Sequence, residues 1–253
     1  MITLGIDIGS ISTKAVVLQD KEIMFSSIRP TGYDVKIAGE GIIKDLAVEG
    51  FDVSLCNRIV ATGYGRNAVS FADKRVTEIT CHAAGVHFLA PEVRSIIDIG
   101  GQDCKAIAID ASGRVTDFVM NDKCAAGTGR FLEVMARALE VDLEDFGDFS
   151  LQSGNSAPIS NICTVFAESE VIAQISKGEQ RGNIIAGIHE SVGSRVAALA
   201  NRVGMSNPTM LTGGVAKNVG VVHALSEKLE ISIKVSEKAQ ITGALGAALI
   251  AAL

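Results

Sequence analysis

Two short segments of the sequence carry the same chemically active side chains at the same spacing. Asp7 is followed by a glycine turn and then by Lys14, and Asp98 is followed by a glycine turn and then by Lys105. Each aspartate ends an apolar, β-branched run and each lysine leads into another, which predicts a strand, a tight turn and a second strand. The two aspartates lie 98 − 7 = 91 residues apart, so the sequence indicates duplicated halves.

A third glycine turn follows a short apolar run at residues 210–218, Met-Leu-Thr-Gly-Gly-Val-Ala-Lys-Asn, and leads into an expected helix. Glycine lets the backbone approach a phosphate without an intervening side chain, and clustered N–H groups bind anions. Three such turns therefore predict one polyanionic ligand. The chain has no Walker loop and no G-x-G-x-x-G after its first strand, which disfavours P-loop and Rossmann sites.

This order of motifs resembles the superfamily of actin, hexokinase and heat-shock chaperone ATPases. The resemblance implies an α/β chain with two ribonuclease-H-like domains and ATP in the cleft between them. The two hairpins would then be the phosphate motifs, and the Thr-Gly-Gly turn would be the adenosine motif. The expected domains are residues 1–92 plus 241–253, and residues 93–240.

Such an ATP site gives a role to most polar residues of the three turns. A magnesium ion that bridges the terminal phosphates prefers carboxylates and water, so Asp7 and Asp98 are expected to hold it. The expected phosphate ligands are Gly9, Ser10, Ser12, Thr13, Lys14, Gly100, Gly101 and Gln102. The expected adenosine ligands are Gly213, Gly214, Val215, Asn218 and, by family likeness, Gln240.

The attacking water needs an orienting acceptor, for which Glu78, Gln102 and Asp103 are the candidates. Glu78 opens the helix-like run of residues 79–89, where the resemblance puts a connecting element near the γ-phosphate. An alternative for Glu78 is a charge that complements the N-terminal end of the helix dipole.

Cys124 and Cys163 each lie at or just before the expected start of a helix. The first is followed by Gly-Thr-Gly at 127–129 and by a helix with apolar positions at Phe131, Val134, Met135, Ala138 and Leu139. The positive end of a helix dipole favours a thiolate. Two thiols cannot complete the four-cysteine shell of an iron–sulfur cluster, whereas a twofold dimer supplies four. On spacing alone, cysteines at helix starts are more often structural or simply reactive.

Four longer motifs narrow the resemblance: residues 61–66 (Ala-Thr-Gly-Tyr-Gly-Arg), 97–103 (Ile-Asp-Ile-Gly-Gly-Gln-Asp), 121–132 (Asn-Asp-Lys-Cys-Ala-Ala-Gly-Thr-Gly-Arg-Phe-Leu) and 163–170 (Cys-Thr-Val-Phe-Ala-Glu-Ser-Glu). They closely resemble the ATP-dependent activators of 2-hydroxyacyl-CoA dehydratases, a group that includes benzoyl-CoA reductase ATPase subunits. The family implies a homodimer with ATP in each subunit and one bridging [4Fe-4S] cluster, held by Cys124 and Cys163 of both chains. It also implies one-electron transfer from reduced ferredoxin or flavodoxin to an iron–sulfur partner enzyme.

Three alternatives stay open at this point. Close relatives of the family serve a double-cubane iron–sulfur protein instead of a dehydratase. A small-molecule kinase of the same superfamily would transfer the phosphoryl group, and an iron-free nucleotide switch would keep ATP and the dimer. The sequence does not distinguish between these partners, and it does not identify the electron donor.

Composition excludes several classes of protein. A net charge of −6 and 4% aromatic residues disfavour a nucleic-acid partner. The first residues form no basic leader, and the charge-free stretch at 239–253 is too short for a membrane span, so a cytoplasmic protein is expected. Cys56, Cys81 and Cys104 are expected to be buried free thiols. No metal-binding spacing connects His82, His87, His189 and His223.

Overall fold

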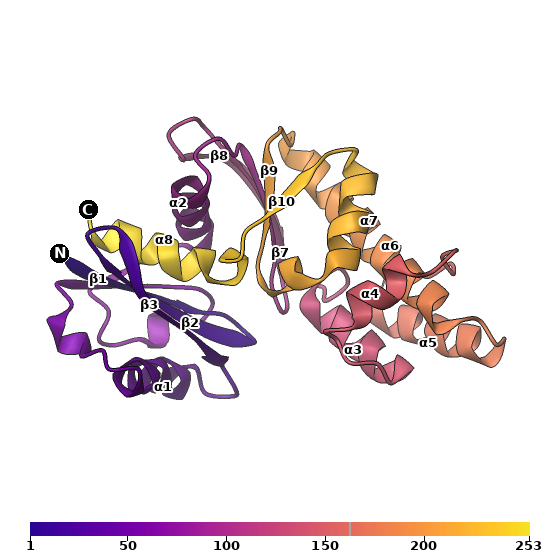
Figure 1. The fold of residues 1–253 in the computed structure, drawn as a ribbon, viewed down its shortest axis with the longest axis horizontal. Helices are drawn as coiled ribbons and strands as arrows, with labels where there is room; N and C mark the ends of the chain where they lie inside the picture. Colours follow the sequence, from indigo (N-terminus) through magenta and orange to yellow (C-terminus); the bar gives the residue numbers. More distant parts are fainter. Residues whose placement is uncertain (162) are drawn as a thin grey trace. The chain divides into compact units, whose positions relative to one another are not determined.

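The computed structural model describes residues 1–161 and 163–253, and the chain divides into two compact units (Figure 1). The first unit contains residues 1–96, 107–117 and 236–253, and the second contains residues 97–106 and 118–235. The domain borders expected from the sequence remain a proposal.

The first unit is built on a five-stranded mixed sheet in the order β3-β2-β1-β4-β5. Its strands are β1 (Ile2–Ile8), β2 (Ser12–Gln19), β3 (Glu22–Pro30), β4 (Arg58–Thr62) and β5 (Lys74–Arg75). The first three strands form an antiparallel meander, and β4 pairs parallel to β1. This register places Asp7 opposite Lys14 across the predicted first hairpin.

Helices cover both faces of this sheet. They are α1 (Val35–Val48), α2 (Glu78–Leu89) and α8 (Thr242–Ala251), with short 3₁₀ turns η1 (Val53–Leu55), η2 (Arg66–Ala68) and η5 (Ala239–Ile241). Ile42 and Leu46 of α1 join one buried apolar cluster with β1, while Ala244 and Leu245 of α8 join another with β2. A Cβ at Gly246 would overlap the carbonyl group of Cys81, so the close contact of α8 with α2 requires glycine there.

The second sheet has five strands in the order β10-β9-β6-β7-β8. They are β6 (Ser95–Ile99), β7 (Cys104–Ile109), β8 (Val115–Asn121), β9 (Thr209–Thr212) and β10 (Ile233–Val235). The central strand, β6, is buried along its whole length, including the polar residues Ser95 and Asp98.

The helices of the second unit are α3 (Gly129–Leu139), α4 (Phe146–Leu151), α5 (Thr164–Ser176), α6 (Arg181–Ala200) and α7 (Val219–Leu229), with 3₁₀ turns η3 (Asn201–Val203) and η4 (Gly214–Lys217). The long α6 packs against α4 and α7. None of the helices within the described ranges combines the length and apolarity that a membrane span requires.

The buried stripe of α3 differs in part from the sequence prediction. Phe131, Met135 and Leu139 are buried as expected, whereas Val134 and Ala138 are only half-buried. The remaining buried positions are Leu132 and Ala136. They belong to the adjacent i, i+4 row, so the helix is rotated slightly from the expected face.

Candidate functional site

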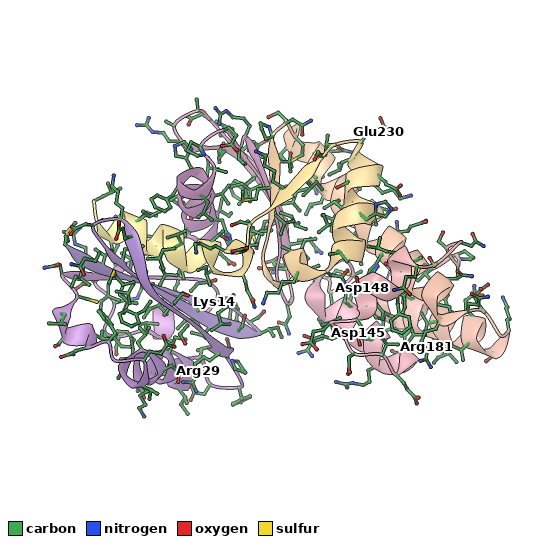
Figure 2. The ribbon with its side chains drawn as sticks, viewed as in Figure 1. Lys14, Arg29, Asp145, Asp148, Arg181 and Glu230 are labelled. Atoms are coloured by element: carbon green, nitrogen blue, oxygen red, sulfur yellow. The ribbon has the colours of Figure 1, made fainter. Side chains whose placement is uncertain are left out.

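The first hairpin forms as the sequence predicts. The N–H of Gly9 donates to the carbonyl oxygen of Ser12 at 3.1 Å, and Lys14 Nζ lies 3.2 Å from Asp7 Oδ2. Lys14 is shown on β2 in Figure 2. Asp7 is only 2% exposed, and its other oxygen, Oδ1, has no hydrogen-bond partner among the described residues. A buried carboxylate oxygen without a partner fits a bound cation or a water molecule held by one.

The second hairpin repeats this geometry atom by atom. The N–H of Gly100 donates to the carbonyl oxygen of Asp103 at 2.9 Å, and Lys105 Nζ lies 3.2 Å from Asp98 Oδ2. Each of these residues follows its counterpart in the first hairpin at the same interval of 91 positions (98 − 7 and 105 − 14). The structure thus confirms the duplicated hairpins. One difference is that Lys105 is 1% exposed and also lies 2.9 Å from Asp103 Oδ2.

Each unit also has a Thr-Gly turn beside its buried aspartate. Thr212 Oγ1 donates to Asp98 Oδ1 at 2.8 Å, and Gly213, at φ +87°, lies so close to the carbonyl group of Ile99 that a Cβ would overlap it. In the first unit, Thr62 and Gly63 occupy the corresponding place, which the sequence analysis did not recognise.

The Thr62–Gly63 turn does not bond its aspartate as the Thr212–Gly213 turn does. Gly63 has φ +86°, and a Cβ there would overlap Asp7 Oδ1. Thr62 Oγ1 is buried and has no hydrogen-bond partner within the part of the chain that the structure describes. Asp98 therefore has a protein partner on each oxygen, whereas Asp7 keeps Oδ1 open. The donor set fits a magnesium ion best at Asp7.

Other expected phosphate ligands differ in how accessible they are. Ser10, Ser12 and Lys14 are partly exposed, and Gln102 is exposed. Thr13 is fully buried and its hydroxyl lies 2.9 Å from that of Thr31, and its expected role as a phosphate ligand stays a prediction. Thr31 in turn donates to the carbonyl oxygen of Gly9 at 2.8 Å, so Thr13 supports the turn from behind.

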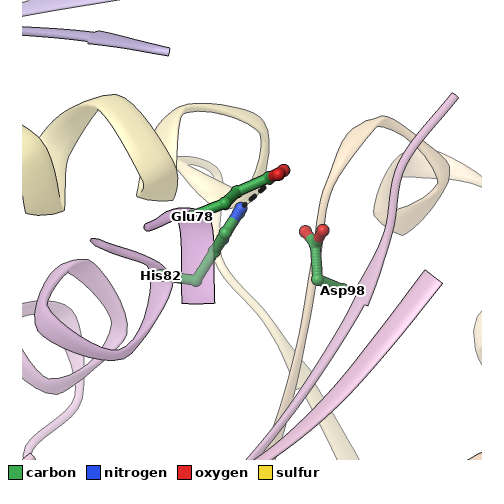
Figure 3. Close-up of side chains that lie close together, drawn as sticks. All are labelled: Glu78, His82 and Asp98. Atoms are coloured by element: carbon green, nitrogen blue, oxygen red, sulfur yellow. Dashed lines mark ion pairs between the residues drawn. The ribbon is translucent and has the colours of Figure 1, made fainter. Parts of the chain in front are cut away.

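Glu78 begins α2, as predicted, and lies beside a histidine to which the sequence gave no role. Its Oε1 is 3.7 Å from Nε2 of His82, while Nδ1 of His82 is 2.9 Å from Oγ1 of Thr242. Figure 3 shows the Glu78–His82 pair and, on β6, the carboxylate of Asp98. The signal for His82 was its i, i+4 spacing from Glu78, which places both on one face of a helix.

Gln240 lies in η5, directly before α8. Its side-chain Oε1 is buried and has no hydrogen-bond partner among the described residues. This open polar atom fits the sequence expectation that Gln240 binds part of a ligand.

In the second unit, the start of α3 meets the second hairpin turn and the third glycine turn. The N–H groups of Gly129 and Arg130 donate to the carbonyl oxygens of Gly100 and Gly101 at 2.9 and 2.8 Å. A Cβ at Gly129 would be 3.4 Å from Val215 Cγ2. Thr128 is the N-cap of α3, which confirms residues 127–129 as the lead into this helix.

The two cysteines of interest lie where the sequence predicts. Cys124 precedes α3, and the Asn121 side chain donates from Nδ2 to the carbonyl oxygen of Cys124 at 2.8 Å. Cys163 is the N-cap residue of α5. Both are free thiols of intermediate exposure.

The other three cysteines are less suited to binding a metal. Burial is the main cause that raises the pKa of Cys56 and of Cys104 to about 11 and the pKa of Cys81 to about 12. Cys81 and Cys104 are buried as expected. Cys56 is only half-buried, because it follows the short η1 turn and lies outside the strand that comes next.

One arginine on α6 contacts both cysteine-bearing loops, which the sequence did not suggest. Arg195 Nη1 donates to the carbonyl oxygen of Asn161 at 3.0 Å, just before Cys163. A Cβ at Gly127, just after Cys124, would be 3.4 Å from Arg195 Cδ. Arg195 therefore holds the two loops on a common support.

The profile of the BadF/BadG/BcrA/BcrD ATPase family matches residues 4–251. The chain belongs to this family. It is 52% identical to the activator of lactoyl-CoA dehydratase of Anaerotignum propionicum, over 99% of this chain and 97% of that protein. It is 50% identical to the (R)-2-hydroxyglutaryl-CoA dehydratase activating ATPase of Acidaminococcus fermentans, over 98% of this chain and 96% of that protein.

Solved structures of related proteins have the same fold. The activator of the 2-hydroxyisocaproyl-CoA dehydratase from Clostridium difficile, with bound ADPNP, matches with a TM-score of 0.94 and 45% identity, covering 99% of this chain and 94% of that one. A ROK family glucokinase from Streptomyces griseus matches with a TM-score of 0.64 and 14% identity, covering 100% of this chain and 99% of that one. The expected actin- and hexokinase-like ATPase fold is confirmed.

Proposed function

We propose that this protein is an ATP-hydrolysing activator that passes a low-potential electron to a partner iron–sulfur enzyme. The observation that carries the proposal is the direct bonding between the second phosphate turn and the helix that follows Cys124. Gly100 and Gly101 accept hydrogen bonds from the first two residues of α3. The turn that we propose binds phosphate is therefore hydrogen-bonded to the helix that follows the free thiol of Cys124.

The ATP part of the proposal is supported by the ADPNP-bound relative and by the open polar atoms of the first unit. Asp7 would hold magnesium through Oδ1, with Asp98 as the second expected carboxylate. Bound magnesium would neutralise charge on the terminal phosphates. Glu78, Gln102 and Asp103 remain the candidates for orienting the attacking water, and Gln102 is the exposed one.

The cluster part rests on the two half-buried thiols, Cys124 and Cys163. One chain offers two thiolates and a homodimer offers four, which is the number that a [4Fe-4S] cluster takes. Such a cluster, when bound, supplies reversible one-electron transfer. The apolar residues Val165, Phe166 and Ile172 of α5 are 54–67% exposed. Because Cys163 is the N-cap of α5, this uncovered apolar face supports a second subunit beside the thiols.

The partner that we propose is a dehydratase-like iron–sulfur protein, and the donor is ferredoxin or flavodoxin in the cytoplasm. The relatives are named as activators for lactoyl-CoA, 2-hydroxyisocaproyl-CoA and (R)-2-hydroxyglutaryl-CoA dehydratases. A double-cubane iron–sulfur protein is the alternative partner.

Anaerobic purification, followed by iron and acid-labile sulfide assays and a native mass measurement, tests the proposal. We expect four irons and four sulfides per dimer. Cys124→Ser and Cys163→Ser should each lose the cluster, whereas Cys56→Ser, a change at another half-buried free thiol, should retain it. An iron-free dimer that still hydrolyses ATP would favour a nucleotide switch, and phosphorylation of a small molecule would favour a kinase.

A further inference from the structure

Asn218 ends the third glycine turn and starts α7. Its backbone N–H donates to the carbonyl oxygen of Val215 at 2.9 Å, which closes the η4 turn. Its side-chain Oδ1 accepts a hydrogen bond from the N–H of Val221 at 3.1 Å, which caps the helix. Asn218 therefore closes the turn with its backbone and caps α7 with its side chain, so the position of this one residue links the two.

A chain of hydrogen bonds, buried except at its Asn218 end, orients the Asn218 side chain. Nδ2 of Asn218 lies 3.2 Å from Nε2 of His189, and Nδ1 of His189 lies 2.8 Å from Oγ of Ser150. The Ser150 hydroxyl donates its hydrogen to the carbonyl oxygen of Gly147 at 2.8 Å. Because that hydrogen is used, Ser150 must accept from Nδ1–H of His189, and Nε2 must accept from Asn218.

The imidazole in this chain is neutral and tightly enclosed. His189 is 2% exposed, and burial lowers its pKa to about 3. A Cβ at Gly220 would overlap both His189 Nδ1 and Ser150 Oγ. Phe146 contacts the imidazole edge-on, with ring centroids 5.4 Å apart. The ring therefore has no room to turn away from Asn218.

We propose that His189 is a positioning residue for nucleotide binding, which acts through Asn218 on the third glycine turn. The inference rests on the proposed ATP site and deepens it. The Asn218 side chain caps α7 and its backbone N–H closes η4, whose backbone we expect at the adenosine end of the nucleotide. The phosphate turns at Asp7 and Asp98 do not belong to this hydrogen-bond chain.

Two substitutions separate the two contacts of His189. In His189→Gln, Oε1 can replace Nε2 as the acceptor from Asn218, but the bond to Ser150 is lost. In His189→Asn, Nδ2 can replace Nδ1 as the donor to Ser150, but the bond to Asn218 is lost. We expect the Asn variant to raise KM for ATP about tenfold with kcat nearly unchanged, which is the order of effect of losing one partly buried hydrogen bond. We expect the Gln variant to retain a KM within about twofold of the unsubstituted protein.

The measurements are steady-state ATP hydrolysis and calorimetric titration with ADPNP on the full-length chain. His223→Gln, at an exposed histidine on α7, is the matched control. If the histidine variants do not fold, Ser150→Ala removes the acceptor that fixes the proton of His189 on Nδ1. The imidazole can then carry its proton on Nε2 and lose the hydrogen bond from Asn218, so this variant should raise KM as His189→Asn does. Equal KM values for the Gln and Asn variants, or a fall in kcat with KM unchanged, would overturn the role of His189. Failure of the unsubstituted protein to bind ADPNP would instead overturn the ATP site itself.

Discussion

Replacing Lys105 by Met tests how the buried lysine of the second hairpin stabilises the fold. Lys105 is 1% exposed and lies 3.2 Å from Asp98, which is itself buried. Removing one partner of a buried ion pair costs about 3–5 kcal/mol, because the remaining charge stays desolvated. For a chain of this length, each kcal/mol lowers Tm by about 2–4 °C, so Lys105→Met should lower Tm by about 6–20 °C.

The first hairpin supplies the matched control. Lys14 makes the same 3.2 Å contact with Asp7, but its side chain is 15% exposed. Water can replace part of the lost interaction there, so Lys14→Met should cost less than about 2 kcal/mol. Scanning calorimetry and urea unfolding measure both variants. Equal destabilisation by the two substitutions would refute the argument that burial of the lysine decides the cost.

Three further predictions follow from single contacts. Arg195→Gln removes the hydrogen bond to the carbonyl oxygen of Asn161. In the cluster-free protein, Cys124 and Cys163 should then react with a thiol reagent about three- to tenfold faster. Arg195→Lys should change this rate less. The pKa of His189 is lowered from 6.5 to about 3 on folding, so the unfolded chain binds a proton that the folded protein does not between these values. Stability should therefore fall as pH decreases below about 6.5, by up to about 1.4 kcal/mol per pH unit, and urea unfolding of His189→Gln at pH 7 and 5 should lack this component. Gly213→Ala, at φ +87° and ψ 177° with an overlapping backbone neighbour, should lower the free energy of unfolding by at least about 3 kcal/mol. Gly204→Ala, at a left-handed position in open space, should lower it by about 1 kcal/mol in the same measurement. Similar losses for the two variants would contradict the effect of the overlap.

Local patterns predicted much of the fold. The two hairpins, the helix starting at Glu78 and the lead into α3 each depend on residues close in sequence, so turn glycines and apolar runs specify them. Residues 241–253, which the sequence analysis assigned to the first domain, include α8, and this helix packs against α2 and β1. These elements also carry most of the expected nucleotide ligands.

Contacts between distant segments could not be predicted in the same way. His189 and Asn218 lie on different elements and meet only because α6 packs against α7. Thr13 faces inward, where its hydroxyl donates a hydrogen bond to the hydroxyl of Thr31 at the end of the neighbouring strand. Arg195 contacts two loops whose sequence positions are far apart. No periodicity encodes such pairs, because side-chain packing decides them.

The helix α6 has a consequence for how the two candidate sites influence each other. His189 on this helix bonds the third glycine turn, and six residues later, about 9 Å along the axis, Arg195 bonds the segment before Cys163. Any coupling that this shared helix carries between the nucleotide site and the thiols is reciprocal by thermodynamic necessity. If bound nucleotide changes the affinity of the thiols for their ligand by a given factor, that ligand changes the affinity for nucleotide by the same factor.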